Sequence, residues 1–87
     1  MISVCLATYN GSAFIKEQLD SILIQIGVDD EVIISDDSSN DDTLDIIKNY
    51  KDHRIVIIES APSASRLGVI KNFERALKSA SGDYISL

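Results

Sequence analysis

Short runs of apolar residues alternate along the chain with longer segments in which apolar residues recur every three or four positions. Continuous apolar runs of this length are typical of strands that are buried on both faces of a sheet. They predict four strands, at residues 2–7, 31–35, 54–59 and 83–87. Residues 60–66, which include the single proline Pro62, are expected to form an irregular loop.

The segments between the strands have the 3.6-residue periodicity of amphipathic helices. They predict helices over residues 12–26, 39–50 and 68–80, with Gly27 as a left-handed residue that ends the first one. The apolar positions that are expected to face inward are Phe14, Ile15, Leu19, Ile22, Leu23, Ile26, Leu44, Ile47, Tyr50, Val69, Ile70, Phe73, Ala76, Leu77 and Ala80.

Strands that alternate with helices of this length indicate right-handed βαβ crossovers. We therefore expect an α/β fold in one small domain over residues 1–87: a Rossmann-like, mostly parallel sheet flanked by helices. A parallel strand that ends the polypeptide would leave an unpaired edge. We accordingly expect the N-terminal half of a larger protein, with self-association through the exposed final strand.

The formal net charge of -6 argues against a nucleic acid or an anionic membrane surface as a partner, because either would require a clustered basic surface. Cys5 is the only cysteine and lies within an apolar run, so we expect a buried side chain. The first residues do not resemble a signal peptide and no apolar run has the length of a membrane span. A cytoplasmic setting is expected, and peripheral attachment to the inner face of the membrane would require other regions.

Polar segments follow three of the predicted strands at their carboxyl ends. They are Thr8-Tyr9-Asn10, the pair Asp36-Asp37, and the segment from Ser60 to Lys71. In a parallel α/β sheet these ends lie at one edge, where ligands bind, so the three segments should converge.

The side chains in these segments suit a nucleoside diphosphate. A planar base could stack on the Tyr9 ring, and the Asp36 carboxylate could accept a hydrogen bond from an imide N–H or a ribose hydroxyl. Lys71 could offset the charge of the diphosphate, and Arg66 is a weaker candidate for the same task.

Each of these residues also has a purely structural interpretation. Tyr9 could simply cover the end of the sheet, and a single Asp before a helix most often caps that helix. Two adjacent carboxylates favour binding, because a cap requires only one of Asp36 and Asp37.

Other polar residues are interpreted as helix caps or solvated side chains. Asn10 is expected to cap the first helix, and Ser39 with Asp42 resembles a capping box for the second. Lys71 opposes the dipole of the third helix, which mildly indicates a binding task, although a solvated lysine is a close competitor.

Several motifs are absent from the sequence. There is no G-x-G-x-x-G after the first strand, no Walker A loop, no His/Cys cluster with zinc spacing, and only one histidine, His53, for any Ser-His-Asp set. The remaining chemistry is acidic and oxygen-based, of the kind that suits Mg²⁺ or Mn²⁺ and phosphates.

Taken in order, these residues resemble the N-terminal nucleotide-binding half of a family 2 glycosyltransferase with the GT-A fold. The resemblance covers essentially the whole chain. It is carried by Ile2-Ser3-Val4, Ala7-Thr8-Tyr9-Asn10-Gly11, Glu17-Gln18-Leu19-Asp20-Ser21-Ile22-Leu23, Ile33-Ile34-Ser35-Asp36-Asp37-Ser38-Ser39-Asn40-Asp41, Leu67-Gly68-Val69-Ile70-Lys71-Asn72-Phe73-Glu74 and Gly82-Asp83-Tyr84-Ile85.

The resemblance implies transfer of a sugar from a UDP- or dTDP-sugar to a glycan or lipid-linked acceptor, usually with inversion and with a divalent metal. It also implies a role in bacterial surface polysaccharide synthesis. The donor nucleotide would contact Ala7, Thr8, Tyr9, Asp36, Asp37 and Lys71.

The same resemblance places the metal-binding D-x-D motif just after Leu87 and the catalytic base further on, so no metal ligand or catalytic residue is expected within this chain. Asp83 is not a substitute, because it begins its strand at the other end of the sheet. The family's usual glycine after the Asp pair is Ser38 here, which is tolerable if that residue keeps a negative φ.

Two alternatives from other classes stay open on the sequence. A receiver-like signalling domain would use an acidic pocket to accept a phosphoryl group, but receivers carry their acidic pair after the first strand and their acceptor after the third. Here the third strand is followed by Ser60-Ala61-Pro62. The second alternative is a non-catalytic module that binds a nucleotide.

Overall fold

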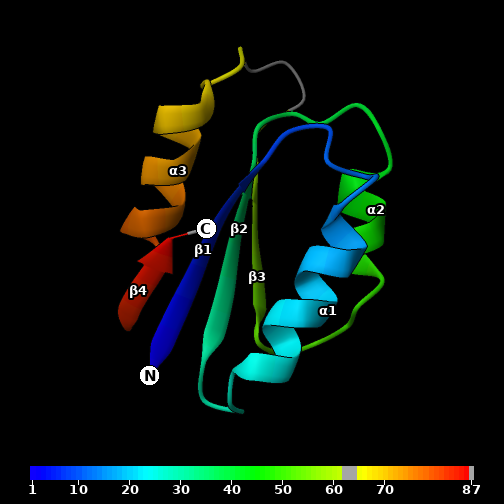
Figure 1. Ribbon diagram of the computed structural model, residues 1–87. Helices are drawn as coiled ribbons and strands as arrows, with labels where there is room; N and C mark the ends of the chain where they lie inside the picture. The colour runs from blue at the N-terminus through cyan, green and yellow to red at the C-terminus, as the bar shows by residue number, and fades with distance from the viewer. Residues whose placement is uncertain (62–64, 87) are drawn as a thin grey trace.

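The computed structural model describes residues 1–61 and 65–86, the last three of them by their backbone alone. The described residues form strands and helices in the predicted order (Figure 1). Pro62, in the predicted loop, and Leu87, in the predicted fourth strand, lie outside this description. The elements are β1 (Ile2–Thr8), α1 (Ile15–Gln25), β2 (Glu31–Asp36), α2 (Thr43–Lys48), β3 (Ile55–Glu59), α3 (Val69–Lys78) and β4 (Asp83–Ser86).

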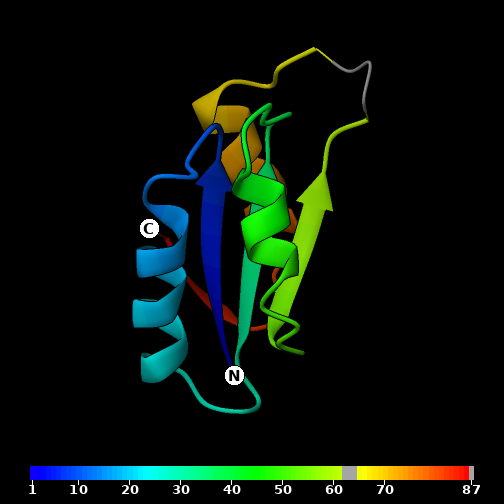
Figure 2. The same ribbon diagram turned by 90° about the vertical axis from the view of Figure 1, so that its right-hand side faces the viewer.

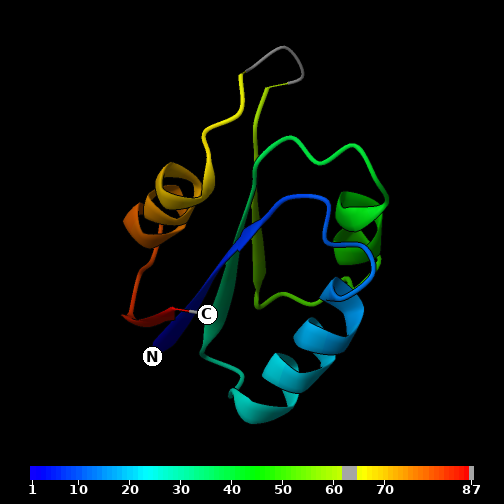
Figure 3. The same cartoon turned by 45° about the horizontal axis from the view of Figure 1, so that its top comes forward.

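The strands form one parallel sheet in the order β3-β2-β1-β4, which confirms the predicted α/β class. Helices α1 and α2 cover one face of the sheet and α3 covers the other (Figures 1 and 2). Because all strands run in the same direction, the loops that follow β1, β2 and β3 lie at one edge, at the top of Figure 1. In Figure 3, where this edge comes forward, the loops after β1 and β2 run side by side.

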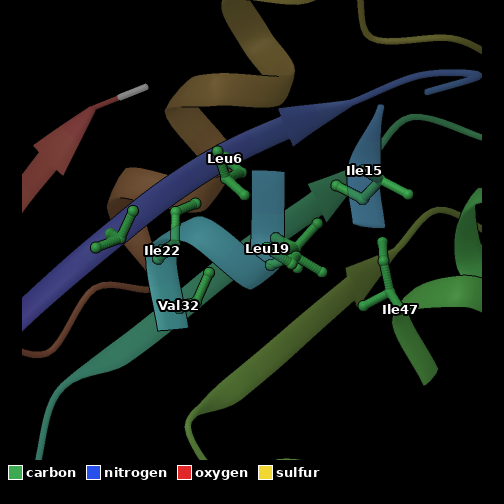
Figure 4. Close-up of a cluster of buried hydrophobic side chains, with 8 residues drawn as sticks. Leu6, Ile15, Leu19, Ile22, Val32 and Ile47 are labelled. Carbon is green, nitrogen blue, oxygen red and sulfur yellow. The ribbon is translucent and has the colours of Figure 1, made fainter. Parts of the chain in front are cut away.

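The hydrophobic core has one part on each face of the sheet, because successive side chains of a strand point to opposite faces. The part under α1 and α2 consists of Val4, Leu6, Ile15, Leu19, Ile22, Val32, Ile34 and Ile47 (Figure 4). The part under α3 is smaller and consists of Cys5, Ile33 and Ala76. Cys5 is buried as predicted, and this burial, with the nearby Glu31, raises the pKa of its thiol.

Helix α1 is shorter than the sequence predicts. It begins at Ile15, because the chain first turns at Gly11, whose carbonyl accepts the N–H groups of Phe14 and Ile15. Phe14 is 72% exposed rather than inward, and Asn10 does not cap the helix.

The end of α1 is also different from the prediction. Gly27 is not left-handed, because Ile26 already leaves the helix in an extended conformation. The guanidinium of Arg54 donates to the carbonyls of Leu23 and Ile26, both at 3.1 Å. A side chain from before β3 therefore satisfies the carbonyls that a glycine motif would otherwise have satisfied.

Helix α2 covers only Thr43–Lys48 of the predicted 39–50, and the predicted capping box of Ser39 and Asp42 does not form. Asp42 precedes the helix without a side-chain cap, and Ser39 is bonded elsewhere. The carboxylate of Asp41 instead accepts the N–H of Thr43 at 3.0 Å. The loop after β2 is thus longer than expected, and its polar residues are free to bond to a neighbouring loop.

Helix α3 presents a different face to the sheet than the one predicted at its start. Val69 and Ile70 are 77% and 75% exposed, whereas Asn72 is buried. Gly68 has φ +85°, a conformation that favours glycine. The turn of the chain at this residue determines which face of α3 is directed toward the sheet. The residues that pack inward are Asn72, Phe73, Ala76, Leu77 and Ala80.

Strand β4 pairs with β1, starting with Asp83 opposite Ile2. Asp83 therefore lies at the amino edge of the sheet, as the sequence predicts. The entry to β4 passes close to the N-terminus: a Cβ on Gly82 would lie 2.6 Å from the carbonyl oxygen of Met1. Within residues 1–61 and 65–86, no helix has the length and apolar content needed to cross a membrane.

Candidate functional site

The carboxyl edge of the sheet brings together the ends of β1, β2 and β3. Thr8 lies opposite Asp36, and Asp36 lies opposite Glu59. The chain continues the pairing for one residue beyond β2, because Asp37 N donates to the carbonyl of Thr8 at 2.9 Å. Two of the three polar segments that the sequence singles out are therefore joined by their backbones.

Asp36 is fully buried, and its carboxylate is bonded on both oxygens. Oδ1 accepts the hydroxyls of Thr8 and Ser39, each at 2.6 Å, and Oδ2 accepts the N–H of Ser39 at 2.9 Å. Buried carboxylates require such donors. In this conformation Asp36 braces the ends of β1 and β2, so its predicted contact with a base or ribose stays a prediction.

The loops after β1 and β2 are held together by hydrogen bonds between residues about thirty positions apart. They run from Asn10 N to Ser39 Oγ (2.8 Å), from Asn40 N to Asn10 Oδ1 (2.9 Å), from Gly11 N to Thr43 Oγ1 (2.9 Å) and from Ser12 N to Asp41 Oδ2 (3.2 Å). These bonds fix the segment that carries Tyr9. Within the second loop, the hydrogen bond from the Thr43 hydroxyl is the main cause that lowers the pKa of Asp41 to about 2.

Asp37 connects the end of β2 to the entry of α3. Its carboxylate is 1% exposed and accepts the N–H groups of Leu67 at 2.8 Å and Gly68 at 3.0 Å. Arg66 Nε lies 3.4 Å from Asp37 Oδ2. Burial raises the pKa of Asp37, but the two backbone N–H groups and Arg66 outweigh it and lower the pKa below its ordinary value. Asp37 is therefore a buried anion that holds the third loop.

The side chain of Arg66 contacts both Tyr9 and Asp37. The central carbon of the Arg66 guanidinium lies 3.4 Å from the centroid of the Tyr9 ring, in a cation–π contact. Tyr9 is 40% exposed and the side chain of Arg66 is 48% exposed. One residue from each of the three loops thus meets at the carboxyl edge, as their convergence predicts.

The remaining predicted site residues are Ala7, Thr8 and Lys71. Ala7 is half-buried in β1, and the buried Thr8 contacts both Asp36 and Asp37 as described above. Lys71 is exposed in the first turn of α3 and has no ion-pair partner among the described residues. It lines an open hollow of about 520 Å³ with Leu67, Gly68, Val69, Ile70 and Glu74.

A polar network beneath this edge was not anticipated from the sequence. Arg75 donates to Ser35 Oγ at 2.7 Å, to Ser60 Oγ at 3.1 Å and to the carbonyl of Asp36 at 2.8 Å. Asn72 accepts the hydroxyl of Ser35 at 2.6 Å and donates to the carbonyl of Thr8 at 3.2 Å. The sequence signal for this network was Asn72, an amide residue four positions before Ala76 and therefore on the face of α3 that packs on the sheet.

Ser38 does not keep the negative φ that would make it a simple replacement for glycine. Its φ is +60°, and its hydroxyl is buried without a hydrogen-bond partner among the described residues. A left-handed conformation is unfavourable for a residue with a Cβ. The turn after the Asp pair is therefore strained at this position.

The described residues contain no group of three or more His, Cys, Asp or Glu side chains that could hold a metal ion. The carboxylates of Asp36 and Asp37 are directed to hydroxyl and N–H donors of the protein itself.

Comparison with known sequences gives a family and named relatives. The model of Glycosyl transferase family 2 matches residues 3–87. The chain is 45% identical over 74 residues to the dTDP-rhamnosyl transferase RfbG of Shigella flexneri, which covers 84% of this chain and 26% of RfbG. It is 41% identical over 86 residues to the UDP-Glc:alpha-D-GlcNAc-diphosphoundecaprenol beta-1,3-glucosyltransferase WfaP of Escherichia coli, which covers 99% of this chain and 33% of WfaP.

Among solved structures, residues 1–349 of S. aureus TarS superpose with a TM-score of 0.83 at 28% identity. The match covers 98% of this chain and 26% of the TarS chain, and TarS has also been solved in complex with UDP. The chain thus spans between 26% and 33% of the length of these relatives.

Proposed function

This chain belongs to glycosyl transferase family 2 and has the fold of the N-terminal part of a GT-A glycosyltransferase, and from that premise we propose that residues 1–87 bind the donor nucleotide of such an enzyme. The whole enzyme transfers a sugar from a nucleotide-sugar donor to an acceptor. The residues that carry out the transfer, and those that hold a divalent Mn²⁺ or Mg²⁺, lie outside this chain.

The observation that carries the proposal is the meeting of Tyr9, Asp37 and Arg66 at the carboxyl edge of the sheet. An aromatic face and a cation, both partly exposed, are the groups that a base and a diphosphate require. The same edge binds ligands in other parallel α/β sheets. The complex of TarS with UDP supports the same class of ligand.

Each of the predicted residues receives a role in this proposal. The base stacks on Tyr9, while Ala7 and Thr8 form the end of the strand that leads to it. Asp36 and Asp37 hold the three loops in place around Tyr9 through their hydrogen bonds. Lys71 faces solvent at the start of α3, where it can approach the phosphates.

The names of the relatives indicate the chemical class of donor and acceptor. One is a dTDP-rhamnosyl transferase, and another is a UDP-glucose-dependent enzyme whose acceptor is a sugar on diphosphoundecaprenol. We therefore propose a UDP- or dTDP-sugar donor, a glycan or lipid-linked acceptor, and a role in bacterial surface polysaccharide synthesis. Such an enzyme would work in the cytoplasm or at the inner face of the membrane.

Substitution of Tyr9 by alanine tests the proposal. Calorimetry of the full-length natural protein with UDP and with dTDP, in the presence of Mn²⁺, should give binding that Tyr9→Ala weakens by about five- to a hundredfold, because stacking on an aromatic ring contributes about 1–3 kcal/mol per base.

Phe14→Ala is the matched control, since Phe14 is also aromatic, is 72% exposed and takes no part in the cation–π contact or the ion pair of Arg66. It should bind both nucleotides like the wild type. Absence of binding by the wild type, or equal binding by Tyr9→Ala, would show that the proposal is wrong.

A further inference from the structure

The Arg66 guanidinium covers the ring of Tyr9. A separation of 3.4 Å between the guanidinium carbon and the ring centroid is van der Waals contact between two planar groups, so no base can fit between them. One face of the ring on which the proposed function places the base is therefore already covered by a side chain of the protein.

Arg66 is held in this position by few contacts. Its side chain is 48% exposed, and its Nε lies 3.4 Å from Asp37 Oδ2, which is longer than a good charged hydrogen bond. Asp37 has shorter bonds to the N–H groups of Leu67 and Gly68. Departure of Arg66 would therefore leave the buried Asp37 carboxylate with two donors.

Arg75 provides the contrast within the same edge. Its guanidinium is partly buried and donates to Ser35, Ser60 and the carbonyl of Asp36. Moving it would break these three hydrogen bonds at once. Of the two arginines at this edge, only Arg66 can move at small cost.

We propose that Arg66 is a displaceable cover of the base site. Before the nucleotide binds, its guanidinium stacks on the ring of Tyr9. When the base binds to that ring face, the guanidinium moves away and pairs with the diphosphate. This inference rests on the proposed function. The cation exchanges a contact with an aromatic face for charged hydrogen bonds to phosphate oxygens, which are stronger. A nucleoside without phosphates displaces Arg66 without that compensation. The cover therefore favours nucleoside diphosphates over nucleosides.

The inference predicts effects of opposite sign for two ligands of one variant. With Arg66→Ala in the full-length natural protein, uridine and thymidine should bind about two- to fivefold more tightly, because the cation–π contact no longer competes. UDP and dTDP should bind about tenfold or more weakly, because a charged hydrogen bond to phosphate is lost. NMR titration suits the weak nucleosides, and calorimetry suits the diphosphates.

Two further variants make the test specific. Arg66→Lys keeps the charge but loses the planar group, so it should bind nucleosides more tightly while keeping most of the affinity for diphosphates. Lys78→Ala removes an exposed cation at the far end of α3 and should change neither affinity. Circular dichroism melts of each variant check that the fold is kept.

The possible failures can be told apart. If Arg66→Ala weakens nucleosides and diphosphates alike, or leaves nucleoside binding unchanged, Arg66 is not a cover and the inference is overturned while the proposed function stands. If the wild type binds neither kind of ligand, the proposed function is wrong and the inference is wrong with it.

Discussion

At the scale of single residues, the two adjacent aspartates have separate tasks. Asp36 accepts hydroxyl and N–H donors from Thr8 and Ser39 on one side, and Asp37 accepts the N–H groups that lead into α3 on the other. Because each carboxyl group has its own donors, two buried aspartates are tolerated next to each other in sequence. Together they position the three loops around Tyr9.

Ser38, the next residue, gives a prediction about stability. Ser38→Gly should raise the free energy of unfolding by about 1 kcal/mol, because glycine adopts φ +60° without strain and leaves no hydroxyl unpaired. Urea denaturation measures the change. Ser79→Gly is the control: Ser79 has φ -91° and should gain nothing. A destabilised Ser38→Gly variant would mean that the hydroxyl has a partner or a task.

At the scale of elements, the loops after β1 and β2 behave as one unit. Their mutual hydrogen bonds replace the helix caps that the sequence predicts for Asn10 and Ser39. Helix α2 is correspondingly short, and Tyr50, two residues after its end, connects it to α1: its hydroxyl donates to Asp20 at 2.7 Å and lies 2.9 Å from the carbonyl oxygen of Lys16. The unit holds Tyr9 at the carboxyl edge.

The joined loops should be sensitive to acid. The pKa of Asp41 is lowered from 3.8 to about 2, so its ionised form contributes stability that is fully present above pH 4 and is lost as the pH falls toward 2. Thermal melts between pH 5 and pH 2 should show that Asp41→Asn is less stable than the wild type at pH 5 and that this difference shrinks toward pH 2.

Asp45→Asn provides the control for that series, because Asp45 is an exposed acidic residue in α2 itself. Its melting temperatures over the same range give the baseline for the loss of one exposed carboxylate in this region. A constant difference between Asp41→Asn and the wild type from pH 5 to pH 2 would contradict the assignment to the ionised carboxylate.

At the scale of the whole molecule, the sheet has two outer strands, and β4 has β1 as its only partner among the described residues. An edge strand presents unpaired N–H and C=O groups to other chains. The free edge of β4 is therefore the place where a second chain can pair.

We therefore expect a polypeptide of residues 1–87 to self-associate through β4. Sedimentation velocity at increasing concentration should show dimers or larger species for this polypeptide, since edge pairing satisfies the backbone groups of β4. The net charge of -6 opposes association, so raising the salt concentration should strengthen it. A single monomeric species at all concentrations would show that β4 does not pair with another chain.

The sequence by itself determined the order of the elements, the buried strands and the edge of the sheet where the candidate site lies. These follow from local patterns: the apolar run around Ile33 must be covered on both faces, and polar residues such as Tyr9 and Asp37 come directly after strands. The burial of the strands and the convergence of the three loops were therefore predictable, because both follow from the apolar pattern and the common direction of the strands.

Only the tertiary structure decided which partner each polar side chain takes. Ser39 bonds to Asp36 and Asn10 instead of capping a helix, and Arg66 covers Tyr9. Arg75, in α3, donates to Ser35 and Asp36 of β2 and to Ser60 after β3. In each case a group distant in sequence competes with a local one of similar energy, and a cap and a cross-loop bond differ by about 1 kcal/mol or less. Local sequence cannot rank such alternatives, because the distance between the groups exists only once the sheet has formed.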